Sequence, residues 1–478
     1  RSEFHDKTFC PRIVSSFEDV KARFDPRGLM NPGKIVHAPA MDDRRVFRYG
    51  PNYEVPEFET ALDWSAWPGA AGGFQGAVEM CNNNGACRKL KGGVMCPSFR
   101  ATRNERDATR GRANTLRFAI SGQMPGGLTS DAMADTMKYC VSCKACRREC
   151  PTGVDMARMK IEVLAARRRE HGLTFAEKLV AHLPRYAPKV ARFAWFMNLR
   201  NKFGPVRKWA EGLTGVSHRR DLPIWSSQPF RDDEAQDTDA DVLLFAAVIN
   251  RYFEPDNLRA AVRVLRRAGH RVAVARDGSG TALDCGRTLL AVGCVDEART
   301  EALRVINATQ DAVARGVPIV GREPSSILTF RDEFLALCPG PAAQALADHA
   351  HTLEEFLATQ PDLPSKPLGH PIYVHGHCHQ KALGAVTPML DLLERIPDTA
   401  VHMIESSCCG MAGAFGYAPD TLDVSLKMAG LDLFPALEAA PADAIIVADG
   451  TSCRHQIADG TPRQAIHVAR LLDKVLGG

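Results

Sequence analysis

The chain has 478 residues, of which 45% are hydrophobic and 24% are charged, and its formal net charge at pH 7 is +4. This composition is typical of a globular protein with about two to four domains. A net charge this small over such a length gives no indication of nucleic-acid binding. No run of about 18 apolar residues predicts a membrane-spanning helix.

The N-terminal residues, RSEFHDKTFC, contain neither an initiator methionine nor an apolar signal core. We therefore expect that the chain begins within a longer polypeptide.

The fifteen cysteines are clustered rather than spread along the chain. Seven lie between Cys81 and Cys150, and four more lie in the last quarter: Cys378, Cys408, Cys409 and Cys453. Large size, clustering and Cys-x-x-Cys spacing favour metal ligation in a reducing compartment over disulfide bonds. We therefore expect a cytoplasmic metalloprotein.

The strongest motif is YCVSCKACRRECP, in which Cys140, Cys143, Cys146 and Cys150 precede Pro151. It matches the bacterial iron–sulfur run C-x2-C-x2-C-x3-C-P. Three thiolates two residues apart wrap around one cluster, and the proline favours extended backbone at the fourth cysteine. A structural zinc site would use two well-separated Cys-x-x-Cys pairs. The run therefore predicts a [4Fe–4S] cluster.

A second set of thiols lies upstream in MCNNNGACRKLKGGVMCPSF, which supplies Cys81, Cys87 and Cys96 followed by proline. In two-cluster ferredoxins the last cysteine of each run ligates the other cluster. Cys96 would then join Cys140, Cys143 and Cys146, and Cys150 would join Cys81 and Cys87. Seven thiolates fall one short of the eight that two cubanes require. The second site is therefore a three-iron cluster, a cubane with a non-cysteine ligand, or absent.

Two helical segments flank the main motif. Residues 100–117 carry six arginines, which either form a solvated basic face or offset the negative charge of the cluster. After Pro151, apolar residues recur at helical spacing, followed by basic residues and Gly172, which predicts a helix that ends there. Together these segments predict a small α-helical ferredoxin-like domain.

Residues 174–235 mix proline, aromatic and basic residues. They form either a basic amphipathic surface for a membrane or quinone access, or helices that pack one domain on another. The prolines break the segment into short pieces, which favours the second alternative.

From Asp241 onward, short apolar strands alternate with helices. The two halves resemble each other at an offset of about 125 residues, so we expect an α/β domain built from two repeats. In the second copy the matched loops carry Cys378, Cys408–Cys409 and Cys453. In the first copy the equivalents are Asn250, Asp284–Cys285, and Ser325 or Ser326.

This asymmetry predicts that the second copy holds a further cluster or metal ion. Loops that converge at strand ends of a doubly wound sheet form a natural site. Adjacent cysteines fit a polynuclear iron–sulfur centre better than one tetrahedral zinc. Neighbouring histidines (His375, His377 and His379) are additional candidate ligands or proton carriers. The alternative is that Cys408 and Cys409 are buried apolar residues.

The pattern of Cys378, Cys408-Cys409-Gly410 and Cys453 resembles the cysteine-rich (CCG) domain of heterodisulfide reductases and glycolate oxidase iron–sulfur subunits. That family usually ends in Cys-x-x-Cys, whereas this chain has SCRHQ, with Cys453 followed by His455. The resemblance to the CCG domain therefore does not by itself imply the non-cubane cluster of some family members.

Two more segments resemble the fused FAD-linked D-2-hydroxy-acid dehydrogenases. RFDPRGLMNPGKIV resembles the end of the FAD-linked oxidase domain, and the segment from Cys81 to Arg117 resembles the ferredoxin-like part. The resemblance implies four parts. Residues 1–40 are the remnant of the FAD-linked oxidase domain, 41–172 the α-helical ferredoxin-like domain, 173–240 a helical linker, and 241–478 the cysteine-rich domain with repeats at about 241–345 and 370–478.

The resemblance implies an oxidoreductase system that oxidises the CH–OH group of a D-2-hydroxy acid such as D-lactate, D-2-hydroxyglutarate or glycolate. Hydride passes to FAD in a flavin domain or partner subunit, and single electrons then pass through the [4Fe–4S] cluster to an acceptor such as quinone. The FAD-binding segment is missing from this chain, so we expect no hydroxy-acid turnover by the chain alone. The alternative is a zinc-stapled or heterodisulfide-reductase-like subunit. A peripheral membrane contact is compatible with either.

Overall fold

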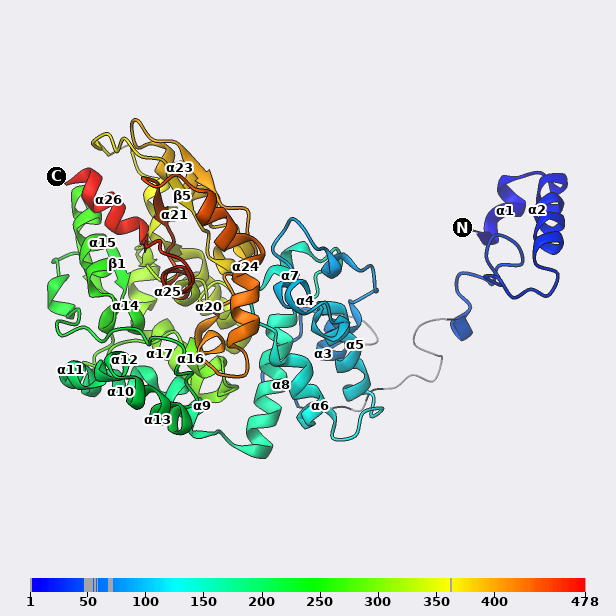
Figure 1. Ribbon diagram of the computed structural model, residues 1–478, viewed down its shortest axis with the longest axis horizontal. Helices are drawn as coiled ribbons and strands as arrows, with labels where there is room; N and C mark the ends of the chain where they lie inside the picture. The colour runs from blue at the N-terminus through cyan, green and yellow to red at the C-terminus, as the bar shows by residue number, and fades with distance from the viewer. Residues whose placement is uncertain are drawn as a thin grey trace. The chain divides into compact units, whose positions relative to one another are not determined.

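The computed structural model describes residues 2–46, 55, 57, 59–67, 72–361 and 363–477. They fall into two compact units, Arg1–Glu57 and Phe58–Gly478 (Figure 1). Among the described residues, no helix is long and apolar enough to cross a membrane.

The first unit contains the helices α1 (His5–Thr8) and α2 (Pro11–Phe24). Pro11 opens α2, where its missing N–H costs nothing, and Lys21 and Arg23 lie in its last turn. Asp25 then turns the chain, because its carboxylate accepts hydrogen bonds from the backbone N–H groups of Leu29 and Met30, both at 2.8 Å.

The second unit begins with a helical region built around α5 and α8. Its elements are α3 (Gly73–Glu79), η3 (Ala86–Arg88), α4 (Pro97–Thr102), η4 (Glu105–Asp107), α5 (Thr109–Ile120), η5 (Gly127–Thr129), α6 (Asp131–Lys138), α7 (Ala145–Glu149) and α8 (Met156–His171). Asp155 caps α8 by accepting the N–H of Arg158, and Gly172 ends it, as the sequence predicted. Leu116, Met133 and Met137 are buried in this region.

The arginine-rich segment is not one helix with a solvated basic face. It is divided among α4, η4 and α5, and two of its arginines are buried. The Arg100 guanidinium makes a bidentate ion pair with Asp432, both contacts being 2.7 Å. Arg112 donates to the backbone oxygen of Thr136 at 3.1 Å. The solvated alternative is therefore wrong for these two residues, because periodicity does not reveal a distant partner.

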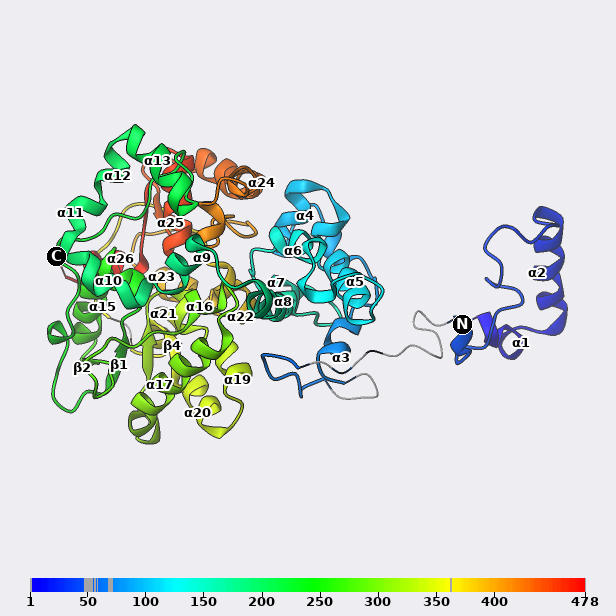
Figure 2. The ribbon, with the colours of Figure 1, turned by 90° about the horizontal axis from the view of Figure 1, so that it is seen from below.

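The next segment forms a run of short helices that cover one edge of the unit (Figures 1 and 2). They are α9 (Phe175–Ala181), α10 (Leu183–Val190), η6 (Ala191–Phe193), α11 (Ala194–Met197), α12 (Leu199–Lys202) and α13 (Gly204–Thr214). Ala187, Ala191 and Ala194 pack with Trp225 and Tyr252. The segment therefore packs on the α/β region that follows.

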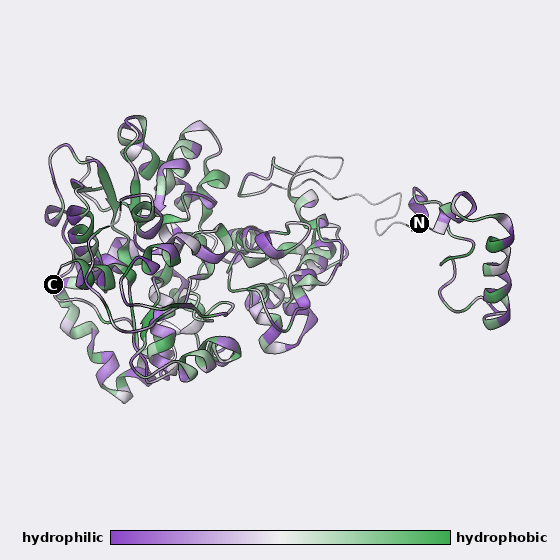
Figure 3. Cartoon of the chain, turned by 90° about the horizontal axis from the view of Figure 1, so that it is seen from above, coloured by the Kyte–Doolittle hydropathy of each residue, from purple (hydrophilic) through white to green (hydrophobic). Residues whose placement is uncertain are grey.

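The α/β region contains two four-stranded parallel sheets with the orders β2-β1-β3-β4 and β6-β5-β7-β8. The strands are β1 (Val242–Phe245), β2 (Val272–Val274), β3 (Ile319–Gly321), β4 (Ala350–Thr352), β5 (Ile372–Val374), β6 (Val401–Met403), β7 (Ile445–Val447) and β8 (Ala465–Ile466). Leu243 pairs with Ala273 and Ile319, and Tyr373 pairs with His402 and Ile446. Figure 3 shows apolar strands and helices that carry both apolar and polar residues.

Helices and short turns alternate with these strands after residue 230. They are η7 (Asp232–Glu234), α14 (Val248–Tyr252), α15 (Pro255–Arg267), α16 (Arg287–Leu290), α17 (Val295–Ala314), α18 (Pro324–Ile327), α19 (Glu333–Leu337), α20 (Pro341–His349), α21 (Leu353–Ala358), α22 (Cys378–Leu383), α23 (Thr387–Glu394), η8 (Gly413–Gly416), α24 (Leu422–Ala439), α25 (Thr451–Gly460) and α26 (Val468–Leu476).

Helices on the two sheets pack against each other. Helix α15 of the first half lies against α26 of the second, and α21 of the first half lies against α23 of the second. One hydrophobic core runs through both halves, with Leu258 and Leu265 from α15 beside Leu471 and Leu472 from α26. In each sheet the strand order reverses between two central strands, which are β1 and β3 in the first sheet and β5 and β7 in the second. Loops that follow these strands are therefore placed to form a site.

Candidate metal centres

The run that starts at Cys140 folds into a tight buried loop between α6 and α8. Ser142 and Lys144 have positive φ angles of 49° and 60°, which turn the backbone around the loop. Cys140, Cys143 and Cys146 are buried and Cys150 is half-buried. The loop therefore gathers three thiols in an interior position, as the cysteine run predicted.

The surroundings of this loop suit a thiolate-bound cluster. Burial raises the pKa of the Cys146 thiol to about 12, yet that sulfur also receives backbone N–H groups of Met156 and Ala157 from the first turn of α8. The Nζ atom of partly buried Lys160 donates to the backbone oxygen of Cys140. Free thiols would be protonated here, whereas bound iron would keep them as thiolates. N–H donors and a nearby cation stabilise sulfur that carries negative charge.

The upstream thiols lie beside the first turn of α5. The Cys96 sulfur is 2.9 Å from the Thr109 hydroxyl and accepts the Thr109 N–H at 3.1 Å. The Cys87 sulfur accepts the N–H of Arg110 at 3.4 Å. Cys87 and Cys96 are hydrogen-bonded to each other, and Cys96 also lies near Cys146.

The structure therefore brings Cys96 next to both cysteine groups, so the crossover of Cys96 and Cys150 between two clusters stays a prediction. Glu149, which precedes Cys150, accepts the backbone N–H groups of Val94 and Met95 at 2.6 and 3.0 Å. The segments that lead into Cys96 and Cys150 are thus fastened to each other.

The four cysteines of the second α/β half meet at the switch point between β5 and β7. Cys378 begins α22 just after β5, and Cys453 lies in α25 just after β7. A chain of hydrogen bonds joins Cys378 to Cys408, Cys408 to Cys409, and Cys409 to Cys453. All four thiols are buried. The four thiols therefore form one buried group.

His375 adds an imidazole to these thiols. A nitrogen of its ring, the Cys409 sulfur and the Cys453 sulfur all lie within 4.8 Å of one another. Burial lowers the pKa of His375 to about 4, which keeps the imidazole neutral and available as a ligand. Ser406 holds the other side of the ring through a 2.9 Å contact with Nδ1.

Two neighbouring side chains shape this thiol site. Buried Lys381 donates to the backbone oxygen of Ser406 at 2.7 Å, and its positive charge lies near all four cysteines. Gly410 has a φ of +85°, and a Cβ there would lie 2.3 Å from the backbone oxygen of Ser425. Only glycine fits after the paired cysteines.

His455 does not belong to this site, because its Nδ1 contacts the hydroxyl of Tyr417 at 2.8 Å. The position where a Cys-x-x-Cys motif would place its second cysteine is Gln456, which is buried and donates to the backbone oxygen of Ser425 at 3.1 Å. His375, which is distant in sequence from Cys453, supplies a ring nitrogen within 4.8 Å of the Cys409 and Cys453 sulfurs.

The equivalent loops of the first half also converge but carry fewer thiols. Cys285 is buried and hydrogen-bonded to Ser326, and burial raises its pKa to about 12. Asn250 is fully buried. With one thiol in place of four, this half offers no comparable donor set among the described residues.

Asp284 in this first-half loop yields a prediction about pH. Burial raises its pKa to about 6, although the Gly286 N–H donates to its carboxylate at 2.8 Å. In the unfolded chain it ionises near 3.9, so the folded state loses stability as pH rises from about 4 to about 6. Asp284→Asn removes this loss. We expect the variant to gain about 1 kcal/mol over the parent between pH 5 and pH 7.

Denaturation of the parent and the variant under anaerobic conditions, at several pH values across this range, measures the difference in their free energies of unfolding. Exposed Asp296→Asn is the matched control for the loss of a carboxylate elsewhere in the same region. An offset between Asp284→Asn and the parent that stays constant with pH would contradict the assignment.

The two thiol-rich regions lie next to each other. Helix α7 packs against α22 (Figure 2). The Nε2 atom of His379 is 3.1 Å from the backbone oxygen of Ser142, and Arg148 donates to the backbone oxygen of Lys381. Cys143 is close enough to Cys378 that each would disfavour a negative charge on the other. The cysteine loop is thus seated on the helix that begins with Cys378.

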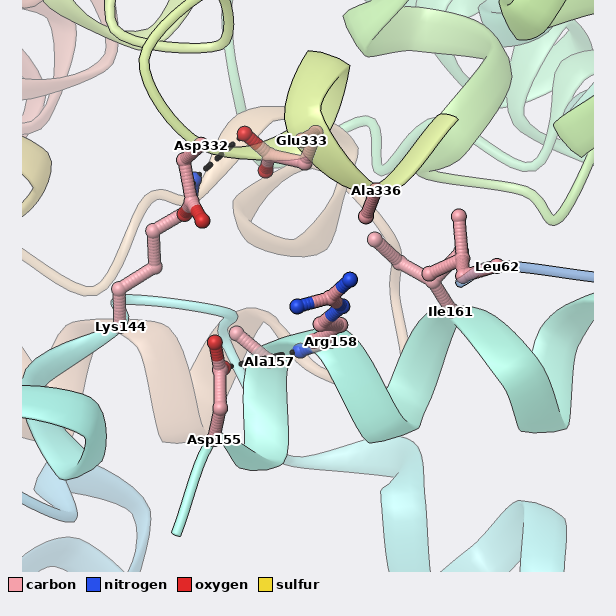
Figure 4. A pocket seen from close by; sticks show the side chains of 9 residues that line it. All are labelled: Leu62, Lys144, Asp155, Ala157, Arg158, Ile161, Asp332, Glu333 and Ala336. Carbon is pink, nitrogen blue, oxygen red and sulfur yellow. Dashed lines mark hydrogen bonds and ion pairs between the residues drawn. The ribbon is translucent and has the colours of Figure 1, made fainter. Parts of the chain in front are cut away.

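A buried ionic cluster holds the other side of the loop (Figure 4). The ammonium of Lys144, whose side chain is 2% exposed, lies 2.6 Å from both Asp332 and Glu333. Arg147 also pairs with Asp332, and Arg287 pairs with Glu333. A small pocket beside this cluster is lined by Leu62, Asp155, Ala157, Arg158, Ile161 and Ala336 as well. No sequence pattern indicated this contact, because its partners are separated by about 190 residues.

Comparison with known proteins agrees with this geometry. Residues 77–154 match the family model described as a 4Fe-4S dicluster domain. The chain is similar to one of the subunits of the anaerobic glycerol-3-phosphate dehydrogenase of Escherichia coli K12, with 28% identity over 296 residues that cover 59% of this chain and 73% of the relative.

It is also similar to D-2-hydroxyglutarate dehydrogenases. The protein from Escherichia coli K12 is 24% identical over 524 residues, which cover 96% of this chain and 48% of the relative. The protein from Pseudomonas putida is 24% identical over 522 residues, which cover 98% of this chain and 49% of the relative. The chain therefore spans about half the length of these dehydrogenases.

Proposed function

We propose that this chain is the electron-transfer part of a flavin-linked dehydrogenase. The premise of this proposal is that residues 77–154 form a 4Fe-4S dicluster domain. The observation that carries the proposal is the contact between the two thiol-rich regions, where the loop with Cys143 rests on the helix that begins with Cys378. Electrons would enter at the ferredoxin-like loops and leave through the C-terminal thiol site.

The chain's own residues supply position, burial and charge for this transfer. We assign Cys140, Cys143 and Cys146, completed by Cys96 or Cys150, to the [4Fe–4S] cluster, which supplies one-electron redox chemistry when bound. Lys160 and Arg112 place positive charge near these thiolates and favour the reduced state. The Lys144 ion pairs fix the loop against the α/β region and exclude water from the contact.

We assign the C-terminal thiols, with His375, to a separate redox centre that contains iron. The four buried sulfurs and the His375 nitrogen make five candidate donors, one more than a single tetrahedral zinc takes. The alternative is a zinc ion held by His375, Cys409 and Cys453, which lie close enough to share one ion. In that case the C-terminal region would be a metal-stapled scaffold.

The substrate of the whole system is proposed as a D-2-hydroxy acid. The support is the similarity to D-2-hydroxyglutarate dehydrogenases along nearly the whole chain. FAD in a flavin domain or partner subunit would take the hydride, and the acceptor would be a quinone. The similarity to part of a glycerol-3-phosphate dehydrogenase supports a second substrate class, an alcohol phosphate.

Anaerobic purification with iron, sulfide and zinc analysis tests the proposal, followed by EPR after dithionite reduction. We expect a brown protein with acid-labile sulfide and a reducible signal. A colourless protein with stoichiometric zinc and no iron would support the scaffold alternative and end the proposed function.

We also propose that the segment from α9 to α13 contacts a membrane surface peripherally, where a quinone acceptor would be reached. Trp209 and Trp195 are 72% and 69% exposed, and Phe193, Phe196 and Phe203 are exposed beside them. Exposed basic residues lie among these rings: Lys189, Arg192, Lys202 and Lys208. Aromatic rings with interspersed positive charge are typical of a surface that binds anionic lipid.

The double variant Trp195→Ala/Trp209→Ala tests this contact in a flotation assay. With vesicles that contain anionic lipid, we expect the parent to float and the variant to bind at least tenfold more weakly, because two interfacial rings are lost. Leu303→Ala, which alters an exposed apolar residue of α17, is the control and should bind like the parent. Equal flotation of parent and double variant, or none by the parent, would refute the contact.

A further inference from the structure

The two cysteine loops of the ferredoxin-like region follow the same backbone path. CNNNGAC at 81–87 aligns with CVSCKAC at 140–146 without a gap. Asn83 and Ser142 have φ angles of 62° and 49°, and Gly85 and Lys144 have φ angles of 79° and 60°. A short helix begins after each turn, at Ala86 and at Ala145. Two left-handed residues at matched positions show that both loops are shaped alike.

Asn84 occupies the position that Cys143 occupies in the other loop. The Oδ1 atom of Asn84 accepts the backbone N–H of Ala86 at 2.8 Å. The sulfur of Cys143 accepts the backbone N–H of Ala145, two residues further on in the same way. The amide oxygen of Asn84 therefore stands where a thiolate sulfur stands in the second loop.

The thiols on either side of Asn84 keep the surroundings of their counterparts. The Cys87 sulfur accepts a backbone N–H from the first turn of α5, and the Cys146 sulfur accepts N–H groups from the first turn of α8. Cys81 and Cys140 are both buried. The first loop thus reproduces the second except at one corner.

We propose that Cys81, Asn84 and Cys87 form three corners of a second iron–sulfur site, with Asn84 at the corner that lacks a thiolate. The inference rests on the proposed function only in requiring that the chain binds iron–sulfur clusters. It names the residue that accounts for seven cysteines where two cubanes would use eight.

The chemistry of this corner follows from its ligand and its exposure. Iron in sulfide clusters favours soft thiolate ligands, and an amide oxygen is a harder and weaker donor. Asn84 is exposed to solvent, whereas Cys143 is buried. The iron at this corner is therefore the one that leaves most easily and that an external ligand reaches first.

An Asx turn alone would explain the bond from Ala86 to Asn84, since asparagine commonly bonds the backbone two residues on. It would not explain why the same left-handed turns, the same flanking cysteines and the same helix-start N–H donors surround it. Those shared features are what a cluster-binding loop requires.

The test is the iron content and EPR spectrum of anaerobically prepared chain before and after mild treatment with ferricyanide. Ferricyanide takes one electron, and [4Fe–4S]²⁺ gives [3Fe–4S]⁺ and Fe²⁺, so charge and iron balance. We expect the parent to lose about one iron per chain and to gain a three-iron signal. Asn84→Cys should lose no iron and show no such signal.

Two further variants make the result specific. Asn82→Cys adds a thiol to the same exposed loop at the wrong corner, so it should behave as the parent does. Cys143→Asn recreates the first loop's ligand set in the second loop, so it should add a second labile iron. The reciprocal variant gives an answer even if Asn84→Cys fails to fold.

The three outcomes separate this inference from the proposed function. If neither the parent nor Asn84→Cys loses iron or gains a three-iron signal, the second site is overturned while the Cys140 cluster stands. An equal three-iron signal in the parent and Asn84→Cys would also overturn the role of Asn84. A chain without iron would overturn the proposed function as well.

Discussion

Cys143→Ser is expected to change the visible absorption and to make the Cys140 cluster lose about one iron on mild oxidation, because one corner of the cubane then lacks its thiolate. Cys143 lies in the buried turn between Ser142 and Lys144 and faces Cys378. A serine hydroxyl is a poor match for iron in a sulfide cluster. Iron and sulfide analysis with the visible spectrum measures the effect.

Cys294→Ser is the matched control, because Cys294 is also buried but lies at the start of α17, outside both thiol groups. It should retain the iron content and spectrum of the parent. If Cys143→Ser and Cys294→Ser give the same spectrum as the parent, the assignment of Cys143 as a ligand is wrong.

Lys144→Ala is expected to destabilise the second unit by about 3–5 kcal/mol, because it leaves two buried carboxylates, Asp332 and Glu333, without their shared ammonium. Arg147 and Arg287 still pair with one carboxylate each, which places the effect toward the lower end. Denaturant-induced unfolding of the cluster-loaded chain measures the loss.

Lys144→Gly separates the ion pair from the backbone at this position. Lys144 has a left-handed conformation, which glycine adopts without strain. The glycine variant should therefore be about 1 kcal/mol more stable than the alanine variant, although both lose the ammonium. Lys138→Ala, which breaks a partly exposed pair with Asp420, should cost no more than about 1 kcal/mol. Equal stability of Lys144→Ala and the parent would contradict the role of the ion pairs.

Much of the site was predictable from local sequence patterns. The cysteine run at Cys140, the helix that ends before Gly172 and the four thiols of the last quarter all depend on spacing within short segments. The offset between the two α/β halves indicated which loops would meet, because loops after the central strands of parallel sheets lie at one edge.

The rest depended on contacts that leave no local pattern. In the sequence, Lys144 is one of several basic residues beside the cysteines, and nothing nearby indicates that it pairs with Asp332 and Glu333. Arg100 likewise belongs to an arginine-rich segment, and the sequence does not indicate that it pairs with Asp432 of α24. The sequence named His375, His377 and His379 together as candidate ligands, and only the direction of each side chain distinguishes His375 as the one grouped with Cys409 and Cys453. The correspondence between Asn84 and Cys143 could have been recognised from the sequence, since CNNNGAC and CVSCKAC align directly.

Mössbauer spectroscopy of the chain loaded with ⁵⁷Fe, before and after dithionite, tests most directly whether this protein carries electrons on iron–sulfur centres. We predict iron in a sulfide-bridged cubane whose spectrum changes when an electron is added. A chain that takes up no ⁵⁷Fe, or whose iron spectrum is the same before and after the reductant, would contradict this prediction.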